Sequence, residues 1–331
     1  MEKARFKWVL RERNRKIAAK TEVFTEQQAR RVRSFHSSFK EYSPTPLIEL
    51  TSLAQHLGIK NLFVKDESYR FELNAFKVLG GSFAIGSYIA NELGEDIDDL
   101  PYMRLVSDEA RSLLGSKTFI TTTDGNHGRG VAWTAYRLKQ QAIVYMPQGS
   151  AAERLANIRA EGAQAEITDM NYDDTVRYTS ELAQKNGWII VQDTAWDGYA
   201  RIPLWIMQGY MTMALEAYEQ LPVKPTHIFL QAGVGSLAGS VQGFFADIYG
   251  SSCPLTFIVE PKGADCLYQT AAANDGSLHS VTGRLETIMA GLACGEPNSI
   301  AWEILGNLSD GFISCPDYTA AQGMRILGNP L

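Results

Sequence analysis

The stretch NLFVKDESYRFELNAFKVLGG, residues 61–81, combines a short apolar strand, a charged turn, and a lysine that precedes a glycine pair and an apolar helix. Lys77 lies between Phe76 and Val78, so we expect its amine to lie in a partly dry environment. Burial disfavours the charged form of an amine and lowers its pKa. A neutral lysine is a nucleophile that forms a Schiff base with a carbonyl group. The alternative is a surface lysine at a helix start, whose stem covers apolar neighbours.

Short apolar strands alternate with helical patterns along the rest of the chain. The strands include TFITTTD (118–124), AIVYMP (142–147), IIVQD (189–193), HIFLQ (227–231) and TFIVEP (256–261). This alternation predicts βαβ units with mainly parallel sheets, which is an α/β fold. Because 331 residues exceed the usual size of one core, we expect two lobes. The expected division is a discontinuous large lobe, residues 1–81 and 211–331, and a small α/β lobe, residues 82–210.

Composition narrows the class of protein. The hydrophobic fraction of 45% and charged fraction of 21% are typical of a soluble globular protein. A net charge of -6 favours neither a nucleic acid nor an anionic membrane as a partner. No apolar run is long enough to span a bilayer, and no signal-peptide core follows the first lysines. Basic residues concentrate in residues 1–40, which we expect to form a solvated arm or helix.

The cysteines and histidines match no metal or redox motif. The four cysteines are Cys253, Cys266, Cys294 and Cys315, and their spacing fits neither a zinc site nor a CxxC pair. We therefore expect reduced thiols in a cytoplasmic protein. The five histidines are scattered along the chain, so we predict no metal site.

A glycine-rich loop, QAGVGSLAG at 231–239, lies between an expected strand and an expected helix. Small residues let a ligand approach the backbone, and free N–H groups at a helix start attract an anion such as phosphate. Gly233, Gly235 and Ala238 also match a GxGxxA dinucleotide pattern, with Glu260 in the position of the ribose-binding acid. A structural turn, a nicotinamide or flavin site, and a site for another phosphate cofactor all remain open from this loop alone.

The segment TTTDGNHGRG, residues 121–130, gathers hydroxyl, carboxyl, amide and imidazole groups at a strand-to-helix turn. Such donors at a helix N-terminus suit a carboxylate or a phenolic oxygen. The alternative is ordinary helix capping by Asp124 or Asn126.

Together, NAFKVLGG, the TTDGNH turn and AGVGSLAG resemble the fold-type II pyridoxal-phosphate enzymes, which include serine and threonine dehydratases, cysteine synthase and the tryptophan synthase β chain. The resemblance implies that Lys77 carries the cofactor. It assigns the substrate carboxylate to the turn, with Thr122, Thr123, Gly125 and His127 as substrate-binding residues. The implied cofactor-binding residues are Lys77, Asn126, Ala232, Gly233, Val234, Gly235 and Ser236.

Within that family, segments over nearly the whole chain beyond about residue 40 are similar to the diaminopropionate ammonia-lyases. They include TTTDGNHGRGVAW, VYMPQGS, VQDTAWDGY and TIMAGLACGEPN. The implied reaction is α,β-elimination from 2,3-diaminopropionate, giving pyruvate and ammonia, in an amino-acid-degrading enzyme that is a homodimer. A serine or threonine dehydratase is the alternative, but Ala75 and Leu79 depart from the S-F-K-x-R-G pattern of the dehydratases.

An elimination needs a base for the α-proton and an acid for the leaving group. We expect Lys77 to serve one face of the substrate Cα and Asp124 the opposite face, so that both enantiomers react. Asp193 would bind the β-ammonium or keep it protonated as it leaves. His127 is either a proton relay or a packed, hydrogen-bonded residue. A nicotinamide dehydrogenase leaves Lys77 unexplained.

The last residues, RILGNPL, follow directly on a helical pattern. By resemblance, the family continues into a further strand–helix–strand portion, which carries the serine or threonine that contacts the pyridine nitrogen. A C-terminal portion is therefore expected to be missing. The second functional hypothesis is accordingly a truncated pseudoenzyme that binds the cofactor weakly or not at all.

Overall fold

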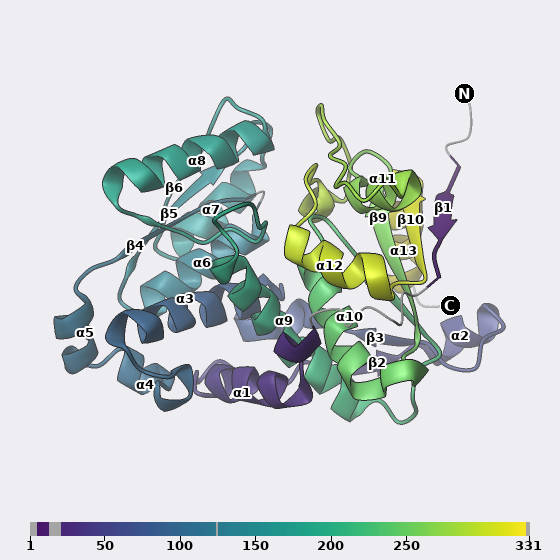
Figure 1. Cartoon of the computed structure of the whole chain (residues 1–331), viewed down its shortest axis with the longest axis horizontal. Coiled ribbons are helices and arrows are strands. Elements are labelled where there is room, and N and C mark those ends of the chain that lie inside the picture. Colours follow the sequence, from purple (N-terminus) through teal and green to yellow (C-terminus); the bar gives the residue numbers. More distant parts are fainter. Residues whose placement is uncertain (1–4, 13–20, 124, 329–331) are drawn as a thin grey trace.

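Two four-stranded sheets form the framework of the chain in a computed structural model, which describes residues 5–12, 21–123 and 125–328. One sheet has the strand order β6-β5-β4-β7 and the other has the order β1-β10-β9-β8, while β2 and β3 form a separate pair. Figure 1 shows β4–β6 in one half of the molecule and β9 and β10 with β1 in the other, with helix α9 between them. The strands are β1 (Lys7–Leu10), β2 (Leu47–Glu49), β3 (Phe63–Lys65), β4 (Thr118–Thr122), β5 (Gln141–Met146), β6 (Gln164–Ile167), β7 (Ile189–Ile190), β8 (His227–Gln231), β9 (Leu255–Pro261) and β10 (Gly311–Cys315).

Helices connect and cover these sheets. The α-helices are α1 (Glu26–Ser37), α2 (Thr51–His56), α3 (Lys77–Leu93), α4 (Tyr102–Leu105), α5 (Asp108–Leu114), α6 (Asn126–Arg137), α7 (Ala152–Ala160), α8 (Tyr172–Asn186), α9 (Arg201–Gln220), α10 (Ser236–Tyr249), α11 (Cys266–Ala273), α12 (Ser299–Leu308) and α13 (Asp317–Gly328). The 3₁₀ helices are η1 (Thr21–Val23), η2 (Glu67–Glu72), η3 (Ile97–Asp99), η4 (Gly250–Ser252) and η5 (Ala290–Leu292).

The strand pairs confirm the predicted α/β fold with mainly parallel sheets. Among the described residues, β4–β5, β5–β6, β4–β7, β8–β9 and β9–β10 pair in parallel, and β1–β10 and β2–β3 pair antiparallel. Parallel strands need crossover connections, and helices supply them on the faces of both sheets. The boundaries expected for the two lobes stay a prediction.

Two local expectations from the sequence are wrong. Lys7–Leu10, expected within a solvated arm or helix, form the edge strand β1 against β10. The strand expected over residues 189–193 is limited to Ile189–Ile190. Its pairing ends because the side-chain oxygen of Gln192 accepts the backbone N–H of Thr122, at 3.1 Å, where a continued strand would supply a backbone carbonyl.

Helix α9 lies at the centre of the helix packing, because it packs against α1, α3 and α10. Beside it lies a buried ion pair in which Arg70 donates to both carboxylate oxygens of Glu216, at 2.8 and 2.7 Å. Both side chains are buried, and Lys65 contacts the same carboxylate at 2.8 Å. A buried charge is tolerated only when it is paired, so this cluster ties the segment before α3 to α9.

Close backbone packing fixes the start of α3, which carries Lys77. A side chain at Gly130 of α6 would bring its Cβ to 2.9 Å from the Cα of Val78. Only glycine permits this approach of the two helices, so the turn and the lysine predicted from the sequence are held beside one another.

No helix within the described residues combines the length and the apolar character that crossing a membrane requires.

Candidate active site

Lys77 and Asp193 form the centre of the candidate site. Lys77 is the first residue of α3, and its Nζ donates a hydrogen bond of 2.6 Å to Oδ2 of Asp193. Asp193 is 4% exposed and lies in the loop after β7. The structure therefore brings together two residues that the sequence singled out separately as catalytic.

The lowered pKa expected for Lys77 from burial is wrong. Burial lowers the pKa of the Lys77 ammonium, but the charge and hydrogen bond of Asp193, together with smaller electrostatic contributions from its neighbours, outweigh burial, so the pKa lies above its ordinary value. Burial raises the pKa of the Asp193 carboxyl, but the charge and hydrogen bond of Lys77, with a smaller contribution from His127, together outweigh burial and lower that pKa to about 2. Lys77 and Asp193 are therefore a charged pair at neutral pH.

The glycine loop adjoins this pair. It links β8 to α10. Gly235 has a φ of +102°, a backbone conformation that glycine adopts readily and that residues with a Cβ rarely adopt. Ser236 is the first residue of α10, and its hydroxyl donates to the backbone carbonyl of Asp193 at 2.5 Å. Ala232 and Val234 are buried in the same loop. The N-terminus of α10 and the Lys77–Asp193 pair thus belong to one site.

Asn298 joins the same parts of the chain, and the sequence predictions missed it. Its Nδ2 donates to the backbone carbonyl of Asp193 and to Oγ of Ser236, both at 2.8 Å. Its Oδ1 accepts N–H groups at the start of α12, where Asn298 is the N-cap. An asparagine before the apolar helical pattern SIAWEIL signals this cap, but nothing local predicts its contact with Asp193.

The residues predicted to bind substrate or cofactor in the turn after β4 lie in different surroundings from one another. The Thr123 side chain is buried and accepts the N–H of Gly125 at 2.9 Å. The Thr122 hydroxyl contacts α8, donating to the carbonyl of Thr175 at 3.2 Å. Asn126 is the first residue of α6 and is exposed. Asp124, the predicted second base, lies outside the described residues.

His127 is buried on α6, and its Nε2 donates to the backbone carbonyl of Val191 at 2.7 Å. This contact favours the packed, hydrogen-bonded role over the proton relay. An electrostatic interaction with His127 also lowers the pKa of the Asp193 carboxyl, so the two side chains are near neighbours.

Glu260 does not face a ligand. Its carboxylate is fully buried and accepts the backbone N–H groups of Leu267 and Tyr268, at 2.9 and 2.7 Å. These donors at the start of α11 occupy the oxygens that a ribose would need, which removes the main support for a dinucleotide site.

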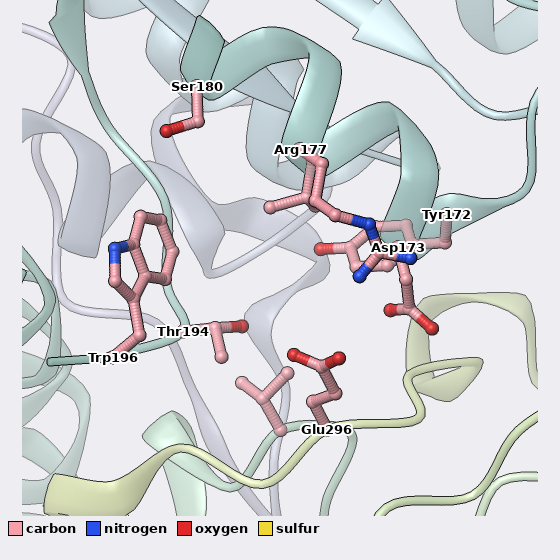
Figure 2. Close-up of a pocket in the computed structure, with 9 residues that line it drawn as sticks. Tyr172, Asp173, Arg177, Ser180, Thr194, Trp196 and Glu296 are labelled. Atoms are coloured by element: carbon pink, nitrogen blue, oxygen red, sulfur yellow. The ribbon is translucent and has the colours of Figure 1, made fainter.

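A cavity of about 240 Å³ opens beside the pair. Thr194, which follows Asp193, and Val234 of the glycine loop both line it, so it adjoins the candidate site. Figure 2 shows the carboxylates of Asp173 and Glu296 on one side of this cavity and Trp196 on another.

The charge in the cavity is predominantly negative. Partial burial raises the pKa of the Asp173 carboxyl, and the negative charge of Glu296 raises it further. Arg177 lowers that pKa, but its guanidinium already forms an ion pair of 2.7 Å with Asp174. Because Asp173 and Glu296 have only Arg177 as a nearby cation among the described residues that line the cavity, and Asp174 shares it, the cavity favours a small cationic ligand.

Comparison with known proteins identifies the class of enzyme. The family described as pyridoxal-phosphate dependent enzymes matches residues 39–329. The chain belongs to this family and is therefore a pyridoxal-phosphate-dependent enzyme.

Particular relatives narrow this class. Diaminopropionate ammonia-lyase of Salmonella typhimurium is 53% identical over 303 residues, which cover 90% of this chain and 75% of the relative. The crystal structure of selenomethionine-incorporated holo diaminopropionate ammonia-lyase from Escherichia coli has a TM-score of 0.90 and 50% identity, covering 98% of this chain and 81% of that chain. The complex of the Escherichia coli enzyme with D-serine has a TM-score of 0.90 and 49% identity, with the same coverage. Within the family, the chain is thus similar to the diaminopropionate ammonia-lyases.

The residues of the site fit this cofactor. Lys77 supplies an amine for its aldehyde, and the N-terminus of α10 supplies backbone N–H groups for a phosphate. A Cβ at Gly233 would come within 3.2 Å of the Cys294 sulfur, so a side chain there would crowd the loop. The Tyr210 hydroxyl is buried near Lys77 and makes no hydrogen bond within the described part of the chain.

Proposed function

We propose that this chain catalyses α,β-elimination of 2,3-diaminopropionate, with pyruvate and ammonia as products. Loss of the β-amino group and the α-proton gives one ammonia, and hydrolysis of the remaining enamine gives pyruvate and a second ammonia. One water is consumed, so the atoms balance. The observation that supports this proposal most directly is the charged Lys77–Asp193 pair beside a negatively charged cavity.

The cofactor supplies, when bound, an electron sink for the negative charge that develops at the substrate Cα. Lys77 is assigned two roles, attachment of the cofactor and removal of the Cα proton on one face. Its position at the first residue of α3, held by the close contact of Gly130 with Val78, limits the directions in which the amine can move.

Asp193 is assigned the role of binding the β-amino group of the substrate. Its carboxylate is ionised and buried, and it exchanges the Lys77 ammonium for the substrate ammonium once the substrate is bound. A protonated β-amino group leaves as neutral ammonia. An unprotonated amino group would have to leave as the amide anion, which is a much poorer leaving group. Thus Asp193 favours elimination by keeping the leaving group protonated.

The cavity is assigned to selection of the substrate. Diaminopropionate carries one amino group more than serine, and Asp173 with Glu296 attracts that additional positive charge. The substrate carboxylate is assigned to the turn that holds Thr123, Gly125 and Asn126, as the sequence predicts. Asp124 stays the predicted base for the second enantiomer.

The test measures both products. Purified protein is loaded with pyridoxal phosphate, its visible absorbance is recorded before and after borohydride, and diaminopropionate is then added. We expect two ammonia molecules for each pyruvate. Lys77→Ala should lose the borohydride-trapped cofactor and the turnover, while Lys60→Ala, at an exposed position, should retain both. Turnover of serine or threonine without turnover of diaminopropionate would instead identify a dehydratase, and an absorbing but inactive protein would identify a pseudoenzyme.

We also propose that the enzyme is a homodimer and is cytoplasmic. Light scattering during size-exclusion chromatography measures the first property, and fractionation of cells measures the second. Limited proteolysis tests the lobe boundaries near residues 81 and 210.

A further inference from the structure

Tyr210 of α9 lies against the first turn of α3. An atom at the Cβ position of Gly80 would lie 2.8 Å from Cζ of Tyr210, the ring carbon that carries the hydroxyl. The Phe76 ring contacts the Tyr210 ring edge-on, with centroids 5.2 Å apart. Lys77 lies between Phe76 and Gly80, and residues three apart share one face of a helix. The polar end of the tyrosine is therefore on the same side of α3 as Lys77.

The Tyr210 hydroxyl is an unsatisfied polar group. The side chain is 1% exposed, and the oxygen makes no hydrogen bond among the described residues. A buried hydroxyl without a partner costs about 1–3 kcal/mol, so such a group calls for a role. Burial raises the pKa of the phenol above its ordinary value, against the charge of Lys77 and together with the charge of Asp193. Tyr210 is therefore a protonated donor at neutral pH.

The same face of α9 also borders Asp193. Met207, one turn before Tyr210, contacts Nδ2 of Asn298 through its sulfur at 4.0 Å. That Nδ2 donates to the backbone carbonyl of Asp193 at 2.8 Å. The tyrosine is also close enough to both Lys77 and Asp193 for their charges to act on its hydroxyl.

The Asp193 carboxylate needs another hydrogen-bond donor when Lys77 is no longer its ion-pair partner. When Lys77 is linked to the cofactor it no longer offers an ammonium group to Asp193, and a buried carboxylate without a partner is strongly disfavoured. We propose that Tyr210 is a positioning residue that donates its hydrogen bond to the Asp193 carboxylate whenever Lys77 is linked to the cofactor. This inference rests on the proposed role of Lys77 as the cofactor anchor.

The test uses Tyr210→Phe, which keeps the ring against Gly80 and Phe76 and removes only the hydroxyl. Tyr218→Phe is the matched control, because Tyr218 lies on the same helix and its ring packs against Phe244 and Tyr249. The affinity for pyridoxal phosphate is measured from its visible absorbance, without substrate. We expect Tyr210→Phe to weaken binding about tenfold, the loss of one hydrogen bond to a charged group, and Tyr218→Phe to leave it unchanged.

A double-mutant cycle separates this role from packing. In an Asp193→Ala background, Tyr210→Phe should have no further effect on the affinity. Equal weakening in both backgrounds, or none in the wild-type background, would overturn the proposal. A second measurement needs no Asp193 variant: the pH midpoint at which the bound cofactor's absorbance changes as Asp193 is protonated should rise by about one unit in Tyr210→Phe. An unchanged midpoint would also overturn it. Absence of a visible band that borohydride abolishes in the wild type would instead contradict the role of Lys77.

Discussion

Lys77 and Asp193 are 116 residues apart in the chain, yet their side chains form a hydrogen bond of 2.6 Å in a buried site. Each determines the charge of the other, because burial alone would push the pKa of the lysine down and that of the aspartate up. The resting protein therefore holds a protonated lysine, whereas condensation with an aldehyde needs a neutral amine.

Asp193→Asn should consequently have opposite effects on uptake of the cofactor and on turnover of the substrate. Without the carboxylate, burial is the dominant effect on Lys77, so its pKa falls and the neutral fraction rises. We expect cofactor-free Asp193→Asn to take up pyridoxal phosphate faster than the wild type, with the pH midpoint of uptake lowered by at least about one unit. Turnover of diaminopropionate should fall at least about a hundredfold, because the β-amino group loses its partner. Uptake slower than that of the wild type would contradict the pair's effect on the lysine.

Asp124→Asn tests the two-base hypothesis. The substitution should reduce turnover of D-diaminopropionate by about a hundredfold or more, while turnover of the L-enantiomer changes by less than about tenfold. The measurement is kcat/KM for each enantiomer with the same preparation. Equal losses on both isomers would refute separate bases for the two faces.

The acids of the cavity should govern the choice between diamino and hydroxy amino acids. Asp173→Asn and Glu296→Gln each remove one negative charge, so we expect KM for diaminopropionate to rise roughly fivefold per substitution. The KM for serine should stay unchanged, because serine lacks the second ammonium. Glu181→Gln, an exposed acid on the same helix as Asp173, is the control and should change neither KM. A parallel rise for both substrates would count against charge recognition.

The Arg70–Glu216 pair should dominate the acid sensitivity of the fold. Burial raises the pKa of the Glu216 carboxyl, but hydrogen bonds and charge from Arg70 outweigh it and lower the pKa from 4.5 to about 2. The unfolded state therefore binds a proton first as the pH falls. The stabilisation is fully present above about pH 4.5 and is lost as the pH falls through about 2.

Glu216→Gln should accordingly lower the free energy of unfolding at neutral pH by about 3 kcal/mol, because it leaves Arg70 with an incomplete set of partners. The penalty should shrink as the pH approaches the lower limit of that window. Glu219→Gln is the matched control on α9: its ion pairs with Arg30 and Arg33 are at the surface, so the cost should stay below about 1 kcal/mol. Denaturant titrations at several pH values measure both. A penalty for Glu216→Gln independent of pH would exclude the charge as its cause.

The sequence predicted those parts of the fold and site that depend on local patterns. Alternating apolar strands and helices determined the α/β class, and the glycine loop was expected where β8 meets α10. Strand β4 and the helix after its turn also lie where the apolar pattern indicated. Each of these features follows from residues that are neighbours in the chain.

What the sequence missed depends on contacts between distant residues. The charge of Lys77 depends on Asp193, and no local pattern indicates that pairing. Asn298 carries the signature of a helix cap, yet its amide also connects Asp193 to Ser236. Tyr210 belongs to an ordinary apolar helix pattern, and only the packing of α9 on α3 brings its hydroxyl to the site.

Strand β1 has a consequence for the order in which the protein is assembled. Lys7 pairs with Ser314, and Leu10 pairs with Gly311, so about 300 residues must be synthesised before this edge of the sheet can form. Until β10 leaves the ribosome, the apolar side chains of Trp8 and Leu10 have no strand beside them. The small sheet of β4 to β7 draws on a single continuous segment and can form earlier. Among the described strands, β1 therefore waits longest for its partner during synthesis and is the most open to mispairing.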